Sequence, residues 1–395
     1  MIRNLSIIVC LLLGTTAVAN PPIELLGVAQ IPGSAIDHSG LKQDLGDGCP
    51  ADRLGGFSGI EYTGHGDRFI ILPDRGAGDG RVPYPCRMHQ VDLRINRSKS
   101  SIDVDWIDTV MLTGDAGQTL DGSFQTRLSD TEGDRHWLAM DPESIRRWGD
   151  QWLISDEYGP HLAIFDSAGK FADQWLLPAD RLCHHRAEHG IGKDDPVGCV
   201  NNRGLEGLAV TPEGVWSAYQ STLMQDGDFD GKWYRGLLTR WMLCDNHGKR
   251  IKEIAYPMEN DRVGISEILT YDHHRFLVIE RDGKQGNKTR CKRIYLTDIS
   301  PAEDVSDCIT LRDRKDLVTA QKTLWMDLTD PRWGLGEIGT AEKPEGMTWG
   351  PNLPDGRSTL WICWDNDFEA NQTSNLACFA VDRKTQRVSL RYKQD

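Results

Sequence analysis

The sequence predicts an all-β protein, specifically a single-domain β-propeller with five visible four-stranded repeats. Helical periodicity is scarce, whereas short runs of β-branched and aromatic residues, separated by Gly, Asp and Asn, recur along the chain. A glutamate among small residues recurs five times, and strands follow each copy at similar spacing. The 395 residues include 40 Gly and 13 Trp, so the chain is long and apolar enough to bury a large core.

The first 19 residues have the pattern of a secretory signal peptide. Arg3 supplies the charged start, residues 7–13 are apolar, and Ala17-Val18-Ala19 has the small residues of a cleavage site. We therefore expect a periplasmic or secreted protein whose propeller domain spans residues 20–395. No later stretch has the roughly 18 to 20 apolar residues of a membrane span. The net charge of −14 argues against nucleic-acid binding.

Cysteines in an exported protein are expected to form disulfides, because the compartment is oxidising. Neighbouring positions suggest four pairs, although sequence alone does not determine connectivity. These pairs are Cys49–Cys86, Cys183–Cys199, Cys291–Cys308 and Cys363–Cys378, with Cys244 left over.

Five segments each carry a glutamate among small residues. The glutamates are Glu61, Glu143, Glu206, Glu267 and Glu345. In the first four repeats, 13 residues separate the glutamate from a polar residue that ends the following apolar strand. Those polar residues are Asp74, Asp156, Tyr219 and Glu280. In the fifth repeat the separation is 20 residues, to Asp365, and a loop insertion around residues 354–356 explains the difference.

Third and fourth strands complete each repeat. A third strand ends on Asp at residues 90–92, 163–166, 242–245, 295–298 and 379–382, and a fourth follows at 102–106 and 388–392. Four antiparallel strands are typical of a propeller blade. An early strand at residues 25–29 is free to pair with the last repeat and close the ring. We interpret residues 114–138, 179–203 and 313–342 as loops; a sixth, diverged blade or two stacked β-sandwiches are the alternatives.

Equivalent positions in a ring of blades converge on one central opening, so the repeated acids should lie together. Several carboxylates side by side need a counter-cation, and hard cations prefer oxygen ligands. We expect Ca²⁺ first and Mg²⁺ second. The candidate metal ligands are Glu61, Asp74, Glu143, Glu206, Glu267 and Glu345. The alternative is that each glutamate caps backbone amides of its own blade.

Three arginines, Arg75, Arg203 and Arg281, stand next to these acids in the sequence. They are candidate clamps for an anionic substrate, since guanidinium binds phosphate and carboxylate groups through paired hydrogen bonds; alternatively, they only pair with neighbouring acids. Histidine is largely absent from the repeats, which favours a metal-activated water with a carboxylate general base over a Ser–His mechanism. The candidate general bases are Asp156, Glu157 and Glu280.

A second acidic motif lies outside the repeat pattern. Asp226, Asp228 and Asp230 match the front half of an oxygen-ligand calcium loop. Leu237 stands where the closing glutamate of such a loop would be. The motif is therefore either a peripheral Ca²⁺ site or an acidic hairpin tip.

At these motifs the chain resembles the phytase-like family, often labelled "esterase-like activity of phytase". The matching stretches, between about residues 50 and 385, are 55–60, 73–76, 141–145, 155–160, 202–207, 279–282 and 344–347. The resemblance implies an exported, propeller-like hydrolase and does not imply phytate as the substrate. The third repeat departs from the family pattern, because Tyr219-Gln220 replaces the acid after its second strand.

Taken together, these patterns predict an exported metal-dependent hydrolase that acts on a small anionic phosphate or carboxylate ester at the mouth of the propeller channel. Two alternatives remain open. One is a non-catalytic propeller that binds a ligand or partner protein, and the other is a lactonase-type propeller enzyme with one divalent ion.

Overall fold

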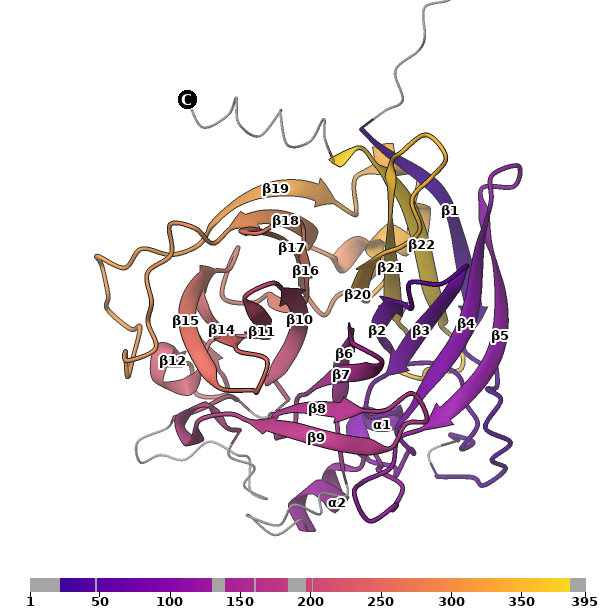
Figure 1. Ribbon diagram of the computed structural model, residues 1–395, viewed down its shortest axis with the longest axis horizontal. Coiled ribbons are helices and arrows are strands. Elements are labelled where there is room, and N and C mark those ends of the chain that lie inside the picture. The colour runs from indigo at the N-terminus through magenta and orange to yellow at the C-terminus, as the bar shows by residue number, and fades with distance from the viewer. Residues whose placement is uncertain are drawn as a thin grey trace, which may run out of the picture.

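The computed structural model describes residues 22–46, 48–129, 139–159, 161–183, 197–200 and 202–383. The regular secondary structure of this part of the chain is almost entirely β-strand (Figure 1). The predicted signal peptide, residues 1–19, and the strand expected at 388–392 lie outside the described residues.

The strands form five four-stranded antiparallel blades, each running from the middle of the ring to its rim. Blade 1 comprises β2 (Phe57–Tyr62), β3 (Arg68–Pro73), β4 (Arg87–Asn96) and β5 (Ser101–Met111). Blade 2 comprises β6 (Pro142–Trp148), β7 (Gln151–Asp156), β8 (His161–Phe165) and β9 (Phe171–Leu176). Blade 3 comprises β10 (Leu205–Thr211), β11 (Gly214–Tyr219), β14 (Leu238–Cys244) and β15 (Arg250–Pro257). Blade 4 comprises β16 (Gly264–Thr270), β17 (Arg275–Arg281), β18 (Lys292–Asp298) and β19 (Gln321–Asp327). Blade 5 comprises β20 (Lys343–Trp349), β21 (Ser358–Asp365), β22 (Thr373–Val381) and β1 (Ile23–Pro32).

The remaining elements are short and lie between blade strands. They are α1 (Ala77–Gly80), α2 (Phe124–Ser129), the hairpin β12 (Asp228–Phe229) and β13 (Tyr234–Arg235), and single 3₁₀ turns at Ala179–Arg181, Met224–Asp226, Gly286–Lys288, Pro331–Trp333 and Gly336–Thr340. The interpretation of residues 313–342 as a loop is wrong, because they contain β19, the outer strand of blade 4. This strand lies at the rim with several exposed residues, so it lacks the apolar run that marks the inner strands.

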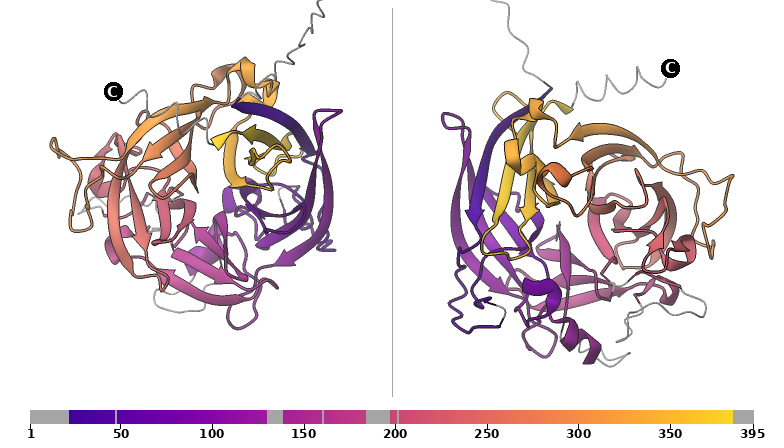
Figure 2. Two further views of the ribbon diagram at one scale, coloured as in Figure 1. Left: turned by 45° about the horizontal axis from the view of Figure 1, so that its top comes forward. Right: turned by 180° about the vertical axis from the view of Figure 1, so that it is seen from behind.

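The ring closes with five blades in the described part of the chain. Each innermost strand contacts the innermost strand of the next blade, in the order β2, β6, β10, β16, β20 and back to β2. As predicted, the N-terminal strand closes the ring: β1 pairs antiparallel with β22, from Ile23–Val381 to Pro32–Thr373. A single parallel bridge, Val28–Ser101, also joins β1 to β5. Figure 2 shows the indigo β1 beside the yellow C-terminal strands.

Each blade is buried on both faces, which explains the uninterrupted apolar runs. In β3, Phe69 and Ile71 pack toward blade 5. Ile70 and Leu72 point to the opposite face and pack toward blade 2. Five such hydrophobic clusters occur, one between each pair of neighbouring blades.

A β-bulge occurs near the start of the innermost strand of every blade. In blade 2, for example, Pro142 pairs with Asp156. The next pair is Ile145 with Ile154, so the inner strand carries one extra residue. The other blades show the same shift. Such bulges re-aim side chains and are frequent next to active sites.

One predicted disulfide, Cys183–Cys199, is present. The other three predicted pairs are wrong, since their cysteines are free thiols; the free cysteines of the described residues are Cys49, Cys86, Cys244, Cys291, Cys308, Cys363 and Cys378. Cys363 and Cys378 illustrate the reason. They lie on neighbouring strands, but Cys378 pairs with Trp361, two residues from Cys363, so the two cysteines are diagonal instead of opposite.

Candidate active site

A polar cavity of about 160 Å³ lies where the innermost strands begin. It is lined by Ser58, Asp74, Arg75, Asp79, Glu143, Glu157, Asn202, Arg203, Glu206, Gln220, Trp233, Arg281, Lys343, Glu345 and Asp365. Seven of these side chains are carboxylic acids and four are Arg or Lys. The cavity therefore has an excess of acid over base, which favours cation binding or protonation of some carboxyls.

Two equivalent positions of the blades supply most of this lining. The first is the bulge residue of the innermost strand, which is Ser58, Glu143, Glu206, Ser266 and Glu345 in blades 1 to 5. The second position is at the end of the second strand. It directly follows the residue that pairs with the innermost strand just before the bulge, and it is occupied by Asp74, Glu157, Gln220, Arg281 and Asp365. All but Ser266 line the cavity.

Glu61 and Glu267 do not join the other three repeat glutamates. They lie further along their strands, because Ser58 and Ser266 occupy the bulge position in their blades. Arg146 contacts both, with its Nη2 2.7 Å from Glu267 and its Nη1 3.6 Å from Glu61. Arg146 also donates hydrogen bonds to carbonyl oxygens of β10 and β16, and so, with its contact to Glu61, connects four blades. The offset of 13 residues is therefore the same in the first four blades although the glutamates are not equivalent. Glu61 and Glu267 lie later on their strands, and the hairpins that follow are correspondingly longer.

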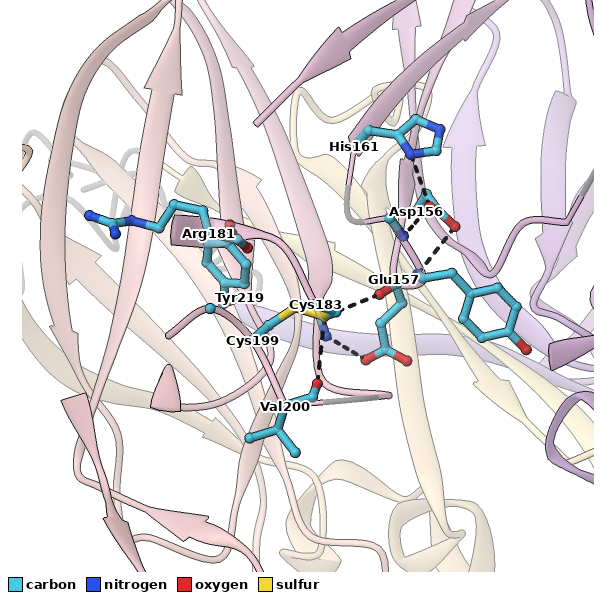
Figure 3. The surroundings of a disulfide bond; sticks show 12 residues. Asp156, Glu157, His161, Arg181, Cys183, Cys199, Val200 and Tyr219 are labelled. Atoms are coloured by element: carbon cyan, nitrogen blue, oxygen red, sulfur yellow. Dashed lines mark hydrogen bonds and ion pairs between the residues drawn. A yellow bond between two sulfur atoms is a disulfide. The ribbon is translucent and has the colours of Figure 1, made fainter. Parts of the chain in front are cut away.

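Asp156 and Glu280 also lie outside the cavity lining. The carboxylate of Asp156 accepts hydrogen bonds from the backbone N–H groups of Asp141 and Gly159 and pairs with His161 Nδ1 at 3.0 Å (Figure 3). Glu280 accepts from Tyr256 Oη at 2.6 Å and pairs with Lys322. Each is a ladder residue, one position before the residue that faces the cavity.

Glu143 is the least satisfied acid of the cavity. Its side chain is 7% exposed, and it has no hydrogen bond or ion pair with any other described residue. One oxygen each of Glu143, Asp141 and Glu157 lie within 4.8 Å of one another, and these residues form the one such group that the described residues contain. Burial raises the pKa of the Glu143 carboxyl well above its usual range, and repulsion by Glu206 adds to the rise.

Glu157 joins the acidic group to blade 3. Its Oε1 accepts a hydrogen bond from Gly204 N at 3.1 Å, and its Oε2 is 3.6 Å from Arg75 Nη1. Burial, and then repulsion by Asp141, raise the pKa of Glu157 to about 8. The disulfide packs against its backbone: Cys183 Sγ is 3.7 Å from the carbonyl oxygen of Glu157 (Figure 3).

Two further acids of the cavity have perturbed pKa values. Gln220 donates a hydrogen bond to Glu206, yet burial and repulsion by Glu157 raise the pKa of Glu206 well above its usual range. Burial also raises the pKa of Asp365 to about 7, although Lys343 lies 3.3 Å away and opposes the rise.

Two of the three predicted arginine clamps are held by carboxylates. Arg75 pairs with the buried Asp141, and the Arg281 Nη2 atom lies 2.5 Å from Glu345. Arg203 differs, because it forms no ion pair with any described carboxylate and instead stacks over Trp233, with its Cζ 5.1 Å from the ring centroid.

Sequence reasoning gave no role to several lining or neighbouring residues. Asp141 and Lys343 occupy equivalent positions, each directly before a Pro-Glu pair. That shared position could have identified both residues from the sequence. Trp233 could not be identified in this way, because it lies in an insertion between β11 and β14, outside the repeat pattern.

The expected peripheral calcium loop does not gather its carboxylates. Asp226 is buried and accepts two hydrogen bonds from Arg240. Asp230 accepts hydrogen bonds from the backbone N–H groups of Lys232 and Trp233. The three aspartates form no group with ligand atoms within 4.8 Å of one another. The segment is the acidic β12–β13 hairpin, which was the alternative interpretation.

The family model described as "Phytase-like: Esterase-like activity of phytase" matches residues 52–368. None of the curated proteins matches the sequence. Among solved structures, the chain is similar to a protein of unknown function from Bacteroides caccae, with 8% identity over 78% of this chain and 72% of that chain and a TM-score of 0.30. It is also similar to a streptogramin B lyase (11% identity, 88% and 96% covered, TM-score 0.29) and to a luciferin-regenerating enzyme (9% identity, 82% and 92% covered, TM-score 0.33). Such low TM-scores carry no information on activity. The described residues include no helix long and apolar enough to cross a membrane.

Proposed function

Because the chain belongs to the phytase-like family, we propose that it is a metal-dependent hydrolase of phosphate or carboxylate esters, with its active site in the acidic cavity at the start of the innermost strands. The observation that carries the proposal is Glu143, a buried carboxyl without a partner among the described residues, next to Asp141 and Glu157.

The residues of this acidic group fit a hard divalent cation. All three side chains offer carboxylate oxygens, the ligands that Ca²⁺ and Mg²⁺ prefer. Asp141 also pairs with Arg75, but a carboxylate has about four lone-pair positions and can serve both partners. A bound cation would offset the excess negative charge and polarise the oxygen of the scissile ester group. We propose Ca²⁺ as the ion, and Asp141, Glu143 and Glu157 as its holders.

Residues of the cavity supply the general base and the binding of the substrate. Of the three predicted general bases, Glu157 alone lines the cavity, and it belongs to the acidic group. We therefore assign proton acceptance from the attacking water to Glu206 on the neighbouring blade. Gln220 donates to Oε1 of Glu206, which orients the carboxyl and leaves Oε2 without a donor among the described side chains. The polar cavity holds the substrate.

Metal content and turnover test the proposal together. The purified protein should contain one equivalent of divalent cation, and EDTA should lower its melting temperature. Turnover of p-nitrophenyl phosphate, p-nitrophenyl esters and lactones should fall at least about 100-fold in Glu206→Gln, the usual effect of losing a general base. Glu61→Gln is the matched control, because Glu61 lies outside the cavity lining.

The results also separate the alternatives. Metal dependence would be refuted if the protein held no stoichiometric ion and if neither calcium nor EDTA changed its melting temperature. Unchanged turnover in Glu206→Gln would remove this residue from the mechanism. Metal binding without hydrolysis of any ester or lactone would leave the non-catalytic, ligand-binding propeller as the better interpretation.

We also propose that the protein is exported. Support comes from the charged, apolar and small-residue pattern of residues 1–19. N-terminal sequencing of protein from the host's periplasm or medium should begin near Asn20; a chain that retains Met1 there would contradict this.

A further inference from the structure

The three arginines of the cavity differ in what they can still bind. Arg75 is engaged by Asp141 at one guanidinium nitrogen and lies 3.2 Å from Asp79 at the other. Arg281 is engaged by Glu345 through two contacts, of 2.5 and 3.3 Å. Both therefore act as counter-ions of cavity carboxylates, which leaves them little capacity for a substrate anion.

Arg203 lines the same cavity but has no carboxylate partner among the described residues. It is partly exposed, and its guanidinium lies over the face of Trp233. Guanidinium offers five N–H donors in a fixed plane and accepts no hydrogen bond, so an accessible, unpaired guanidinium is a ready binding group for an oxyanion.

Trp233 is itself well fixed. Its backbone N–H donates to Asp230 Oδ1 at 2.7 Å, and its carbonyl accepts from Asp230 N at 2.9 Å. The indole packs against a small cluster that includes Val200 and Met224. The ring can thus hold the Arg203 side chain in one orientation, which reduces the conformational entropy that binding would cost.

The surroundings of Arg203 disfavour its positive charge. Burial disfavours the charged guanidinium and lowers its pKa, and the nearby Arg281 acts in the same direction, while Glu157 opposes them. An incoming anion would relieve the repulsion between the two arginines. Arg203 and Trp233 therefore bring a positive charge to the same cavity that Glu143 and Glu157 line.

We propose that Arg203 and Trp233 form an oxyanion-binding subsite, which recognises a carboxylate or phosphate group of the substrate in the cavity that Glu143 and Glu157 also line. This deepens the proposed function and rests on it. The preferred substrates are esters that carry a separate anionic group. Arg203 contacts that group, Trp233 is a positioning residue that orients Arg203, and Arg75 and Arg281 position carboxylates.

Anion binding is measured first, without turnover. Titration calorimetry with inorganic phosphate and with acetate, in EDTA, should show binding to the wild-type protein that weakens about 10- to 100-fold in Arg203→Gln, the usual effect of losing one charge-assisted contact. Arg235→Gln is the matched control, because Arg235 pairs with Asp230 nearby but does not line the cavity. Preference for phosphate or for acetate identifies the type of anion. Equal binding to wild type and Arg203→Gln would overturn the subsite.

Kinetics then test specificity and the role of Trp233. For a p-nitrophenyl ester with a free carboxylate, KM should rise about 10-fold or more in Arg203→Lys and Trp233→Leu, with kcat little changed, and Trp233→Phe should restore most of the affinity. A neutral p-nitrophenyl ester should show no such dependence. If hydrolysis is absent but phosphate binding depends on Arg203, the proposed function fails and the subsite stands. If hydrolysis is present and the KM is the same in the wild type and in Arg203→Lys, the subsite fails and the proposed function stands.

Discussion

Glu143→Gln should stabilise the cation-free protein at neutral pH, against the usual direction of buried substitutions. The folded protein keeps the Glu143 carboxyl protonated to a pH well above 4.5, its ordinary pKa, because burial and repulsion by Glu206 disfavour the charge. The unfolded chain releases that proton near pH 4.5. Folding at pH 7 therefore requires uptake of a proton, at a cost of about 1.4 kcal/mol for each pH unit above the pKa of the unfolded chain, up to the pKa of the folded state. Glutamine keeps the shape of the side chain and carries no such cost.

The expected gain depends on pH and on calcium. Because the folded-state pKa is raised, the cost is absent below pH 4.5 and grows as the pH rises, so the variant should match the wild type near pH 4.5 and be clearly more stable than it at pH 7 in EDTA. Calcium at 100 times its Kd should stabilise the wild type by about 2.7 kcal/mol and the variant far less. Urea unfolding followed by tryptophan fluorescence measures both effects.

Glu267→Gln is the matched control, with the same chemical change at another buried glutamate. Glu267 lies 2.7 Å from Arg146, so although burial raises its pKa to about 7, the glutamine leaves a buried guanidinium without its main partner and should lower the unfolding free energy. The two substitutions thus have opposite expected signs. The reasoning would be refuted if Glu143→Gln were no more stable than wild type at pH 7 in EDTA, or if calcium stabilised it as much as the wild type.

Three further predictions concern the scaffold. Gly207→Ala should lower the unfolding free energy by about 1–3 kcal/mol, since its Cβ would lie 2.5 Å from the Ile268 nitrogen of the next blade; an unchanged urea midpoint would contradict this contact. Reduction of Cys183–Cys199, whose members are 16 residues apart, should cost about 3 kcal/mol in a denaturant titration with dithiothreitol, and no effect would mean that the bond does not constrain the unfolded chain. Deletion of residues 22–32 removes β1 and exposes the edge of β22, so size-exclusion chromatography should show aggregates that the intact chain does not form; elution like that of the intact chain would refute the closure role of β1.

Much of the fold could be predicted because its determinants are local. A run such as Phe69–Leu72 is buried on both faces and has to belong to an inner strand. The apolar segment at residues 25–29 belonged to no repeat and could pair with the last one. In the structure it is part of β1, which pairs with β22 of blade 5. The outer strand β19 was missed because Leu324 and its neighbours are exposed at the rim, so no burial pattern marks it.

The site could be predicted only in part, because a β-bulge leaves little trace in sequence. Glu143, Glu206 and Glu345 share the bulge position and line the cavity, as expected from their similar flanking residues. Glu61 and Glu267 share the motif but not the register, and a shift of even one residue moves a side chain to another face of the strand. Equal spacing along the chain therefore does not guarantee equal position in space.

The closure of the ring by β1 has a consequence for the order of folding. β1 is the first strand synthesised, yet its partner β22 follows about 340 to 360 residues later. At roughly 5–20 residues per second, a ribosome needs about 20 to 70 s to produce that partner. During this interval blades 1 to 4 can form in succession, whereas β1 has no stable sheet to join. Closure of the ring thus joins the first described strand to the last one, and we expect the unpaired edges of β1 and β22 to be prone to aggregation until they pair.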